Sequence, residues 1–446
     1  MADHSFVPHL FFGLDPMITS TVILLITYAA IIWDKLNRAI VALLGAALMI
    51  LIGALDQSEA LNGVDWNTIG LLTGMMILVS ISRRSGIFQF LAIWSARSAK
   101  ASPGGILLLL QLTTAVVSSL LDNVTTVLLI VPVTLAIIRE LEVPPYPFLF
   151  AEVFASNIGG TATLIGDPPN ILIGSLAGLD FNAFIYHLTP IILVVMAAQA
   201  LMIHLLWGKS LKSTPEHRAR VMAMHAKDAI LDPVLLNQSI AVLGLVIVAF
   251  VFARQLHAEP ATIAMTGAAA LMFLDNWQHH NEKQSENVHK TFSDVEWITL
   301  FFFIGLFIVV HGVDVGGLLR LVAGKLVAAT GSDLAAAGYA ILWVSAFLSA
   351  IVDNIPFVAT VIPLIKSMAP AYGGPDKIEP LWWCLSLGAC LGGNGTLIGA
   401  SANLTVAGLA ERNGIPFRFM TYTYYALPMM VVSVAICHIY LWLRYF

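Results

Sequence analysis

The fold is decided by residues 118–132, Ser-Ser-Leu-Leu-Asp-Asn-Val-Thr-Thr-Val-Leu-Leu-Ile-Val-Pro, an apolar run that is interrupted by Asp122 and Asn123. The arrangement returns in residues 349–363, Ser-Ala-Ile-Val-Asp-Asn-Ile-Pro-Phe-Val-Ala-Thr-Val-Ile-Pro, where Asp353 and Asn354 take the two polar positions. A charged side chain at the bilayer centre costs about 2.5–3.5 kcal/mol or more, so such residues usually mark functional positions. The two runs predict hairpins with polar tips inside an apolar protein.

The composition is that of a membrane protein. Of the 446 residues, 58% are hydrophobic and only 11% are charged, and the mean hydropathy is +0.85. A membrane-spanning helix needs about 20 apolar residues, and several windows meet this requirement, which favours a helical bundle over a barrel. We expect an integral protein of the bacterial inner (plasma) membrane. No long basic run indicates a nucleic-acid partner.

The sequence contains an internal repeat. The Asp-Asn pair of the first run recurs 231 residues further along, and Trp66, Gly74 and Pro132 recur at the same distance. Each half is expected to cross the membrane five times, and an odd number of crossings inverts the second half. The predicted units are a first repeat at 1–208, a cytoplasmic linker at 209–236 and a second, inverted repeat at 237–446. Placing most of the 22 lysines and arginines on the cytoplasmic side puts both termini on the outer side.

The expected elements follow from apolar length. In the first half they are spans near 18–33, 39–55 and 66–82, hairpin arms at 104–121 and 124–138, a broken span at 147–178 and a last span at 184–207. In the second half they are spans near 237–253, 260–275 and 297–312, the second hairpin, a broken span at 381–410 and a final span at 421–443. Residues 84–101 and 314–330 read as amphipathic helices in the membrane interface. Residues 277–294, with three histidines, read as a solvated polar loop rather than a metal site.

The broken spans carry the richest polar chemistry. Residues 157–170, Asn-Ile-Gly-Gly-Thr-Ala-Thr-Leu-Ile-Gly-Asp-Pro-Pro-Asn, and residues 392–403, Gly-Gly-Asn-Gly-Thr-Leu-Ile-Gly-Ala-Ser-Ala-Asn, must open a helix and free backbone groups. Many secondary transporters build their sites from such interrupted helices. The candidate substrate-binding residues are Asn123, Asn157, Thr161, Thr163, Asn170, Asn354, Asn394, Thr396, Ser401 and Asn403. The alternative is that these positions are only helix caps and glycine packing contacts.

Three carboxylates are the candidate proton- or ion-coupling residues: Asp122, Asp353 and Asp167. Asp122 and Asp353 also suit a structural role, because an aspartate before a helix caps its first amides. Asp167 precedes two prolines and has Ala400 as its counterpart, so it either separates an ion-coupling half from a substrate half or lies at a water-exposed turn.

No enzymatic constellation is present. The sequence has no HExxH, GxSxG or Walker-type motif, so we expect neither catalysis nor a metal or cofactor, and expect an ion gradient to drive the protein. An ATPase partner stays open as an alternative.

The Asp-Asn tips and the two breaks resemble the ion transporter superfamily that includes ArsB-type arsenite permeases, NhaD-type sodium/proton antiporters, citrate transporters and the melanosomal P protein. The resemblance implies an elevator-type carrier, usually a homodimer, in which the hairpins and broken helices move against a scaffold. It leaves the substrate open. Carboxylates at the tips would repel a carboxylate substrate, so citrate is disfavoured.

Three functions are consistent with this resemblance. The first is proton-coupled efflux of arsenite or antimonite, as in arsenical resistance, because arsenite is a neutral trihydroxide that hydroxyl and amide groups can bind. The second is sodium/proton antiport, with the same aspartates binding the cation. The third is an anion channel or a carboxylate carrier.

Overall fold

The computed structural model describes residues 8, 10, 13–33, 35–277, 279–331 and 333–446. Regular secondary structure within these ranges is helical, in agreement with the predicted class. Nine of the described helices are long and apolar enough to cross a membrane, or ten when α4 and α5, bent by 66°, count as one span. The chain is therefore a polytopic helical membrane protein.

The elements of the first half lie close to their expected positions. The helices are α1 (Pro16–Trp33), α2 (Arg38–Leu51), α3 (Gln57–Asn62), α4 (Trp66–Arg83), α5 (Ile87–Ser98), α6 (Pro103–Leu120), α7 (Asn123–Leu141), α8 (Tyr146–Thr161), α9 (Pro168–Ala177), α10 (Phe181–His187) and α11 (Thr189–Trp207). The hairpin is α6–α7, and the broken span is α8–α9. The last span begins later than predicted, because Asp180 caps the separate short helix α10.

The second half repeats this order after a linker that contains α12 (Pro215–Ala223). Its helices are α13 (Pro233–Val251), α14 (Ala253–Leu256), α15 (Pro260–Asn276), α16 (Asn281–Ser293), α17 (Trp297–Gly316), α18 (Leu318–Ala329), α19 (Leu334–Ile351), α20 (Asn354–Met368), α21 (Glu379–Gly392), α22 (Ser401–Arg412) and α23 (Phe419–Arg444). The second hairpin is α19–α20, and the second broken span is α21–α22.

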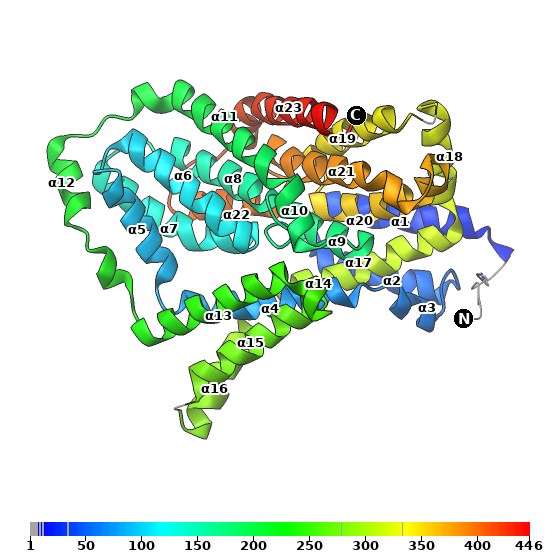
Figure 1. The fold of residues 1–446 in the computed structure, drawn as a ribbon, viewed down its shortest axis with the longest axis horizontal. Coiled ribbons are helices and arrows are strands. Elements are labelled where there is room, and N and C mark those ends of the chain that lie inside the picture. Colours follow the sequence, from blue (N-terminus) through cyan, green and yellow to red (C-terminus); the bar gives the residue numbers. More distant parts are fainter. Residues whose placement is uncertain (1–7, 9, 11–12, 34, 278, 332) are drawn as a thin grey trace.

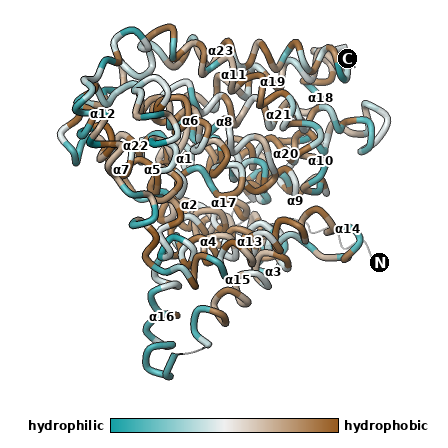
Figure 2. Tube along the Cα trace, turned by 60° about the vertical axis from the view of Figure 1, so that its left-hand side comes forward, coloured by the Kyte–Doolittle hydropathy of each residue, from teal (hydrophilic) through white to brown (hydrophobic). Residues whose placement is uncertain are grey.

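One predicted loop is wrong. Most of residues 277–294 form α16, a polar helix that projects from one end of the molecule, as Figure 2 shows. Gln284 donates to the carbonyl of Asn276, Asn287 donates to the Asn276 side chain, and Lys283 pairs with Glu286 one turn on. Helical spacing of polar residues supports this helix, and that signal is independent of hydrophobicity.

The helices lie in layers. In Figures 1 and 2, α2, α4, α13, α15 and α17 lie on one side of the hairpins and broken helices, while α11 and α23 lie on the other. The linker with α12 runs along the edge of the molecule from α11 to α13 (Figure 1). We call the first group the scaffold layer and the hairpins with the broken helices the central layer.

The scaffold layer contains two close helix contacts, each between a helix of the first half and a helix of the second. Gly74 of α4 lies against Ala264 of α15, and Gly305 of α17 lies against Ala42 of α2. A Cβ atom on either glycine would come within 2.6 Å of the backbone carbonyl carbon of the facing alanine. Small residues permit this backbone approach in membranes. Each half thus packs one helix against a helix of the other half.

The central layer also repeats its contacts. A Cβ atom on Gly159 of α8 would lie 2.2 Å from the carbonyl oxygen of Ala115 on α6, and one on Gly392 of α21 would lie 2.4 Å from that of Ala346 on α19. The Ser118 hydroxyl donates to the Ser156 carbonyl at 2.7 Å. The corresponding Ser349 hydroxyl donates to the Ala389 carbonyl at 2.6 Å. Each hairpin is therefore held against its own broken helix in the same way.

Candidate functional site

The two hairpin tips are built by helix-capping aspartates. Asp122 precedes α7, and its Oδ1 accepts the amide of Thr125 at 2.9 Å. Asp353 precedes α20, and its Oδ1 accepts the amide of Ile355 at 3.1 Å. An aspartate is favoured here because its carboxylate satisfies an amide that has no partner within the helix. Both aspartates therefore cap a helix, which leaves their second oxygens for other contacts.

The two breaks are closed by asparagines. In the first, Asn170 Nδ2 donates to the carbonyls of Thr161 and Thr163 at 3.0 and 2.9 Å. In the second, Asn403 Nδ2 donates at 2.8 Å to the carbonyl of Gly393 and, at the same distance, to that of Thr396. Opening a buried helix leaves carbonyls that must be satisfied inside the protein. Asn170 and Asn403 do this at matching positions.

A chain of buried amides joins the two breaks to the first tip. Asn157 Nδ2 donates to Oδ1 of both Asn394 and Asn403 at 2.9 Å. Asn123 Nδ2 donates to Asn157 Oδ1 at 3.1 Å and to Asp167 Oδ1 at 3.2 Å. A connected network in a low-dielectric interior orders its members. The side chains of the first tip and both breaks are thus fixed relative to one another.

Three predicted hydroxyls have local structural partners. Thr161 Oγ1 donates to the Asn157 carbonyl at 2.7 Å, whereas Thr163 and Thr396 each donate to the carbonyl of a hairpin residue at 2.5 Å. The acceptors are Ser119 and Ala350, respectively. These donors already hold the breaks and the hairpins together.

A small cavity lies where the tips, the first break and the scaffold layer meet. Its volume is about 30 Å³, enough for one or two water-sized occupants. Of the predicted residues, it is lined by Asp122, Asn123, Asp167, Asn354 and Ser401. The scaffold contributes Arg38, Leu72, Met76, Glu296 and Thr299. We call this space the central cavity.

The remaining predicted residues lie behind the wall of the central cavity or beside it. Asp353 faces a neighbouring cavity, and the rest belong to the amide network or the breaks: Asn157, Thr161, Thr163, Asn170, Asn394, Thr396 and Asn403. Asp167 is 1% exposed, which rules out a water-exposed turn. Its Oδ2 has no hydrogen-bond partner among the described residues.

The scaffold side of this site was missed in the sequence. Arg38 Nη1 donates to Asp353 Oδ2 at 3.0 Å and to Ser401 Oγ at 2.7 Å. Ser401 Oγ also donates to Asp353 Oδ2 at 3.0 Å. Arg38 looks like one more loop charge in the sequence, since the partners lie 315 residues apart. Asn37 caps α2, and this cap was the sign in the sequence that Arg38 begins a helix and does not belong to a loop.

A buried carboxylate outside the cavity was also missed. Glu152 lies in α8 and is 1% exposed, and it accepts a hydrogen bond from the hydroxyl of Thr134 on α7. The repeat gives a hint, because the corresponding position holds Leu385. Glu152 lies outside the lining of the central cavity.

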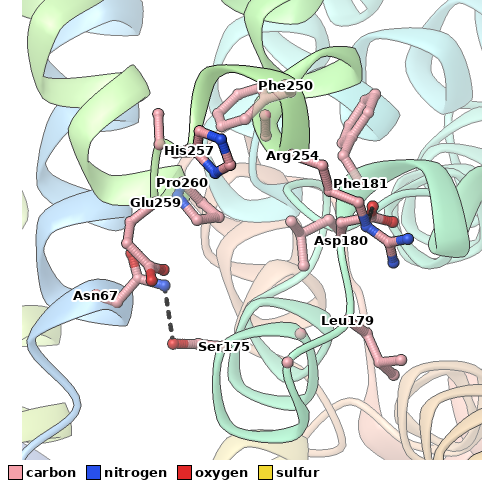
Figure 3. Close-up of a pocket in the computed structure, with 15 residues that line it drawn as sticks. Asn67, Ser175, Leu179, Asp180, Phe181, Phe250, Arg254, His257, Glu259 and Pro260 are labelled. Carbon is pink, nitrogen blue, oxygen red and sulfur yellow. Dashed lines mark hydrogen bonds and ion pairs between the residues drawn. The ribbon is translucent and has the colours of Figure 1, made fainter.

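A larger cavity lies away from this site. Figure 3 shows one of about 510 Å³ between α9–α10 and α14–α15, where Asn67 donates to Ser175 at 3.0 Å and Arg254 pairs with Asp180 at 2.5 Å. None of the predicted site residues lines it. Over the described ranges, no group of three histidine, cysteine, aspartate or glutamate side chains is arranged to hold a metal ion.

The sequence pattern of known citrate transporters matches residues 28–388. The chain belongs to the citrate transporter family. An uncharacterized transporter of Mycobacterium tuberculosis is 43% identical over 433 residues, covering 96% of this chain and 99% of the relative. The human P protein is 33% identical over 506 residues, covering 95% of this chain and 59% of the P protein.

Solved structures agree on the fold. The crystal structure of the YdaH transporter of Alcanivorax borkumensis matches with a TM-score of 0.59 at 12% identity, over 96% of this chain and 98% of that one. MtrF of Neisseria gonorrhoeae, described as an antimetabolite efflux pump, matches with a TM-score of 0.57 at 10% identity, over 98% and 96%. The superfamily resemblance is confirmed, and the chain is a membrane transporter.

Proposed function

We propose that this transporter is a secondary active carrier that exchanges sodium for protons through the central cavity. The observation that carries this proposal is the charge of the cavity lining, where Asp122, Asp167 and Glu296 outnumber the single guanidinium of Arg38. Negative lining attracts cations and repels anions. The small volume suits a bare ion, with amide oxygens and unwound backbone completing its coordination.

The arrangement that we propose around this cavity is an inverted repeat, with units 1–208 and 237–446 and a cytoplasmic linker at 209–236. The duplicated contacts of Gly159 and Gly392, and of Ser118 and Ser349, support it. In this arrangement the central layer moves against the scaffold layer as in an elevator. The protein would lie in the bacterial plasma membrane as a homodimer, with both termini on the outer side. An ion gradient would supply the energy for transport.

The proposed division of labour follows from the contacts. Asp122 and Asp167 take the cation or the proton, because each has a carboxylate on the central cavity. Asn123 and Asn354 add amide oxygens beside them. The amide network of Asn157, with the other asparagines and threonines of the breaks, holds these groups in place.

The test is a flux assay in proteoliposomes that carry a pH-sensitive dye. An outward sodium gradient should drive proton uptake with the native chain, and uptake should fall at least about tenfold in Asp122→Asn and Asp167→Asn, which remove the charge and keep the shape. The matched control is Asp376→Asn, since Asp376 is exposed in the short 3-10 helix Pro375–Ile378. Proton movement that does not depend on sodium would refute the proposal. Native rates of proton uptake in both variants would refute it as well.

Proton-coupled efflux of arsenite or antimonite is the second candidate. It is favoured by a cavity of about 340 Å³ beside the central one, whose lining includes Asn37, Asp353 and Ser401. A neutral trihydroxide can donate to such oxygens without the repulsion that citrate would meet. The same vesicles can be loaded with arsenite or citrate in place of sodium. The substrate whose outward gradient drives proton uptake is then the transported one.

A further inference from the structure

We propose that Arg38 is a built-in competitor of the transported cation, which occupies the Asp353 carboxylate and closes the passage from the larger neighbouring cavity to the central cavity. The proposal rests on the cation carrier proposed above and goes beyond it, because it assigns a specific role to a scaffold residue. It also explains why one of the two hairpin aspartates does not line the central cavity.

The position of Arg38 is the first observation. The central cavity and the 340 Å³ cavity share two lining residues, Arg38 and Ser401. Asp353 lines only the larger cavity, with its Oδ2 turned to the guanidinium at 3.0 Å. The hydrogen bonds among these three side chains therefore lie across the boundary between the two spaces.

The second observation is how the scaffold layer holds Arg38. The guanidinium lies 5.2 Å from the ring centre of Phe302 on α17, and its Nη2 lies 3.5 Å from Thr299 Oγ1. Thr299 in turn donates to Glu296 Oε2 at 3.1 Å. Arg38 is thus fixed on α2 and α17, whereas its partners Asp353 and Ser401 belong to the central layer.

The pair therefore joins the two layers that an elevator must displace. A guanidinium keeps its proton at any pH that a cell meets, so Arg38 can free Asp353 only by separating from it. A cation that binds Asp353 must therefore displace the guanidinium of Arg38. By contrast, the carboxylate of the other tip, Asp122, has no ion-pair partner among the described side chains, so the competition applies to one hairpin only.

The first test measures sodium activation of proton flux in Arg38→Gln. Removing the competitor should lower the half-saturating sodium concentration about tenfold, the lower end of what a charge-assisted hydrogen bond contributes. Arg38→Lys, which keeps the charge, should stay near the native value. Arg139→Gln is the matched control, because Arg139 contacts Asn413 at an exposed site. A merely structural Arg38 would lower the maximal rate and leave half-saturation unchanged, and that result would overturn the proposal, as would weaker sodium activation.

The second test does not depend on the cargo. Met76 lines the central cavity and not the larger one, and the native cysteines Cys384, Cys390 and Cys437 are fully buried. Silver ion is small enough for this cavity and reacts with thiols; added from the side on which the larger cavity opens, it should block Met76→Cys slowly, and faster when Arg38→Gln is added. If sodium exchange fails while the reaction with silver accelerates, the proposed cargo is wrong and the role of Arg38 as a barrier stands. If exchange is present while the reaction with silver is unchanged, Arg38 is not a barrier.

Discussion

Gly159 offers the sharpest test of how the hairpin is placed. It lies in α8, two residues from Asn157, where α6 passes so closely that an added Cβ would lie 2.2 Å from the Ala115 carbonyl oxygen and 2.5 Å from the Ala115 Cα. These are backbone atoms, which cannot rotate away. Gly159→Ala must push the two helices apart.

The size of the effect follows from the geometry. A carbon and a carbonyl oxygen approach to about 3.3 Å at closest, so the helices must separate by about 1 Å. Overpacking of this kind costs about 3 kcal/mol at the upper end, and the better helix propensity of alanine returns up to about 1 kcal/mol. The net loss of about 2 kcal/mol corresponds to a melting temperature roughly 2 °C lower for a chain of this length.

The assay is thermal unfolding of the purified protein in detergent, followed by fluorescence-detected size exclusion. Gly392→Ala should behave like Gly159→Ala, because its Cβ would meet Ala346 in the same way. Gly244→Ala in α13 is the control, since among the described residues no atom outside its own helix backbone and chain neighbours lies within 4 Å of its Cβ. The control should match or exceed native stability. Equal melting temperatures for Gly159→Ala and the control would refute the close approach of hairpin and break.

Two further predictions concern single titratable groups. Burial lowers the pKa of His187; the negative charge of Glu379 opposes this shift, and the positive charge of Arg444 adds to it more weakly. The unfolded chain therefore binds the proton more readily than the folded protein does. Stability should fall as the pH drops below about 6.5. His187→Gln should flatten this loss when melting temperatures at pH 7.5 and 5.5 are compared, and an unchanged slope would contradict the assignment. Glu152→Gln keeps an oxygen for the Thr134 hydroxyl and should melt within about 1 °C of the native protein. Glu152→Ala should melt several degrees lower, because it leaves a cavity. Equal falls in melting temperature for the two variants would contradict a role for this hydrogen bond.

Much of the fold was readable because local chemistry determines it. The capping aspartates fix where α7 and α20 begin, and the glycines and prolines of residues 157–170 dictate where α8 stops and α9 starts. These signals act over a few residues, so the predicted boundaries lie close to the observed ones. The polar pattern that forms α16 is equally local. It was not predicted as a helix because the expected elements were placed by the length of apolar runs.

Of the candidate site, the sequence predicted only the residues of the hairpin tips and the helix breaks. Arg38, Glu296 and Thr299 reach the central cavity from the scaffold layer, and their contacts depend on how α2 and α17 pack. The repeat gave no help, because it relates the two halves without saying which faces meet. The polar residues of the breaks were correctly singled out, yet many of them support the cavity wall instead of lining it.

The reciprocal contacts of Gly74 with Ala264 and of Gly305 with Ala42 bear on how the protein is made. During synthesis α4 enters the membrane long before α15 exists, so its glycine face has only lipid to contact until the second half arrives. A first half made alone would keep this groove open and become a target for quality control. Two halves expressed as separate chains, divided within the linker near α12, should therefore accumulate only when both are present in the same cell.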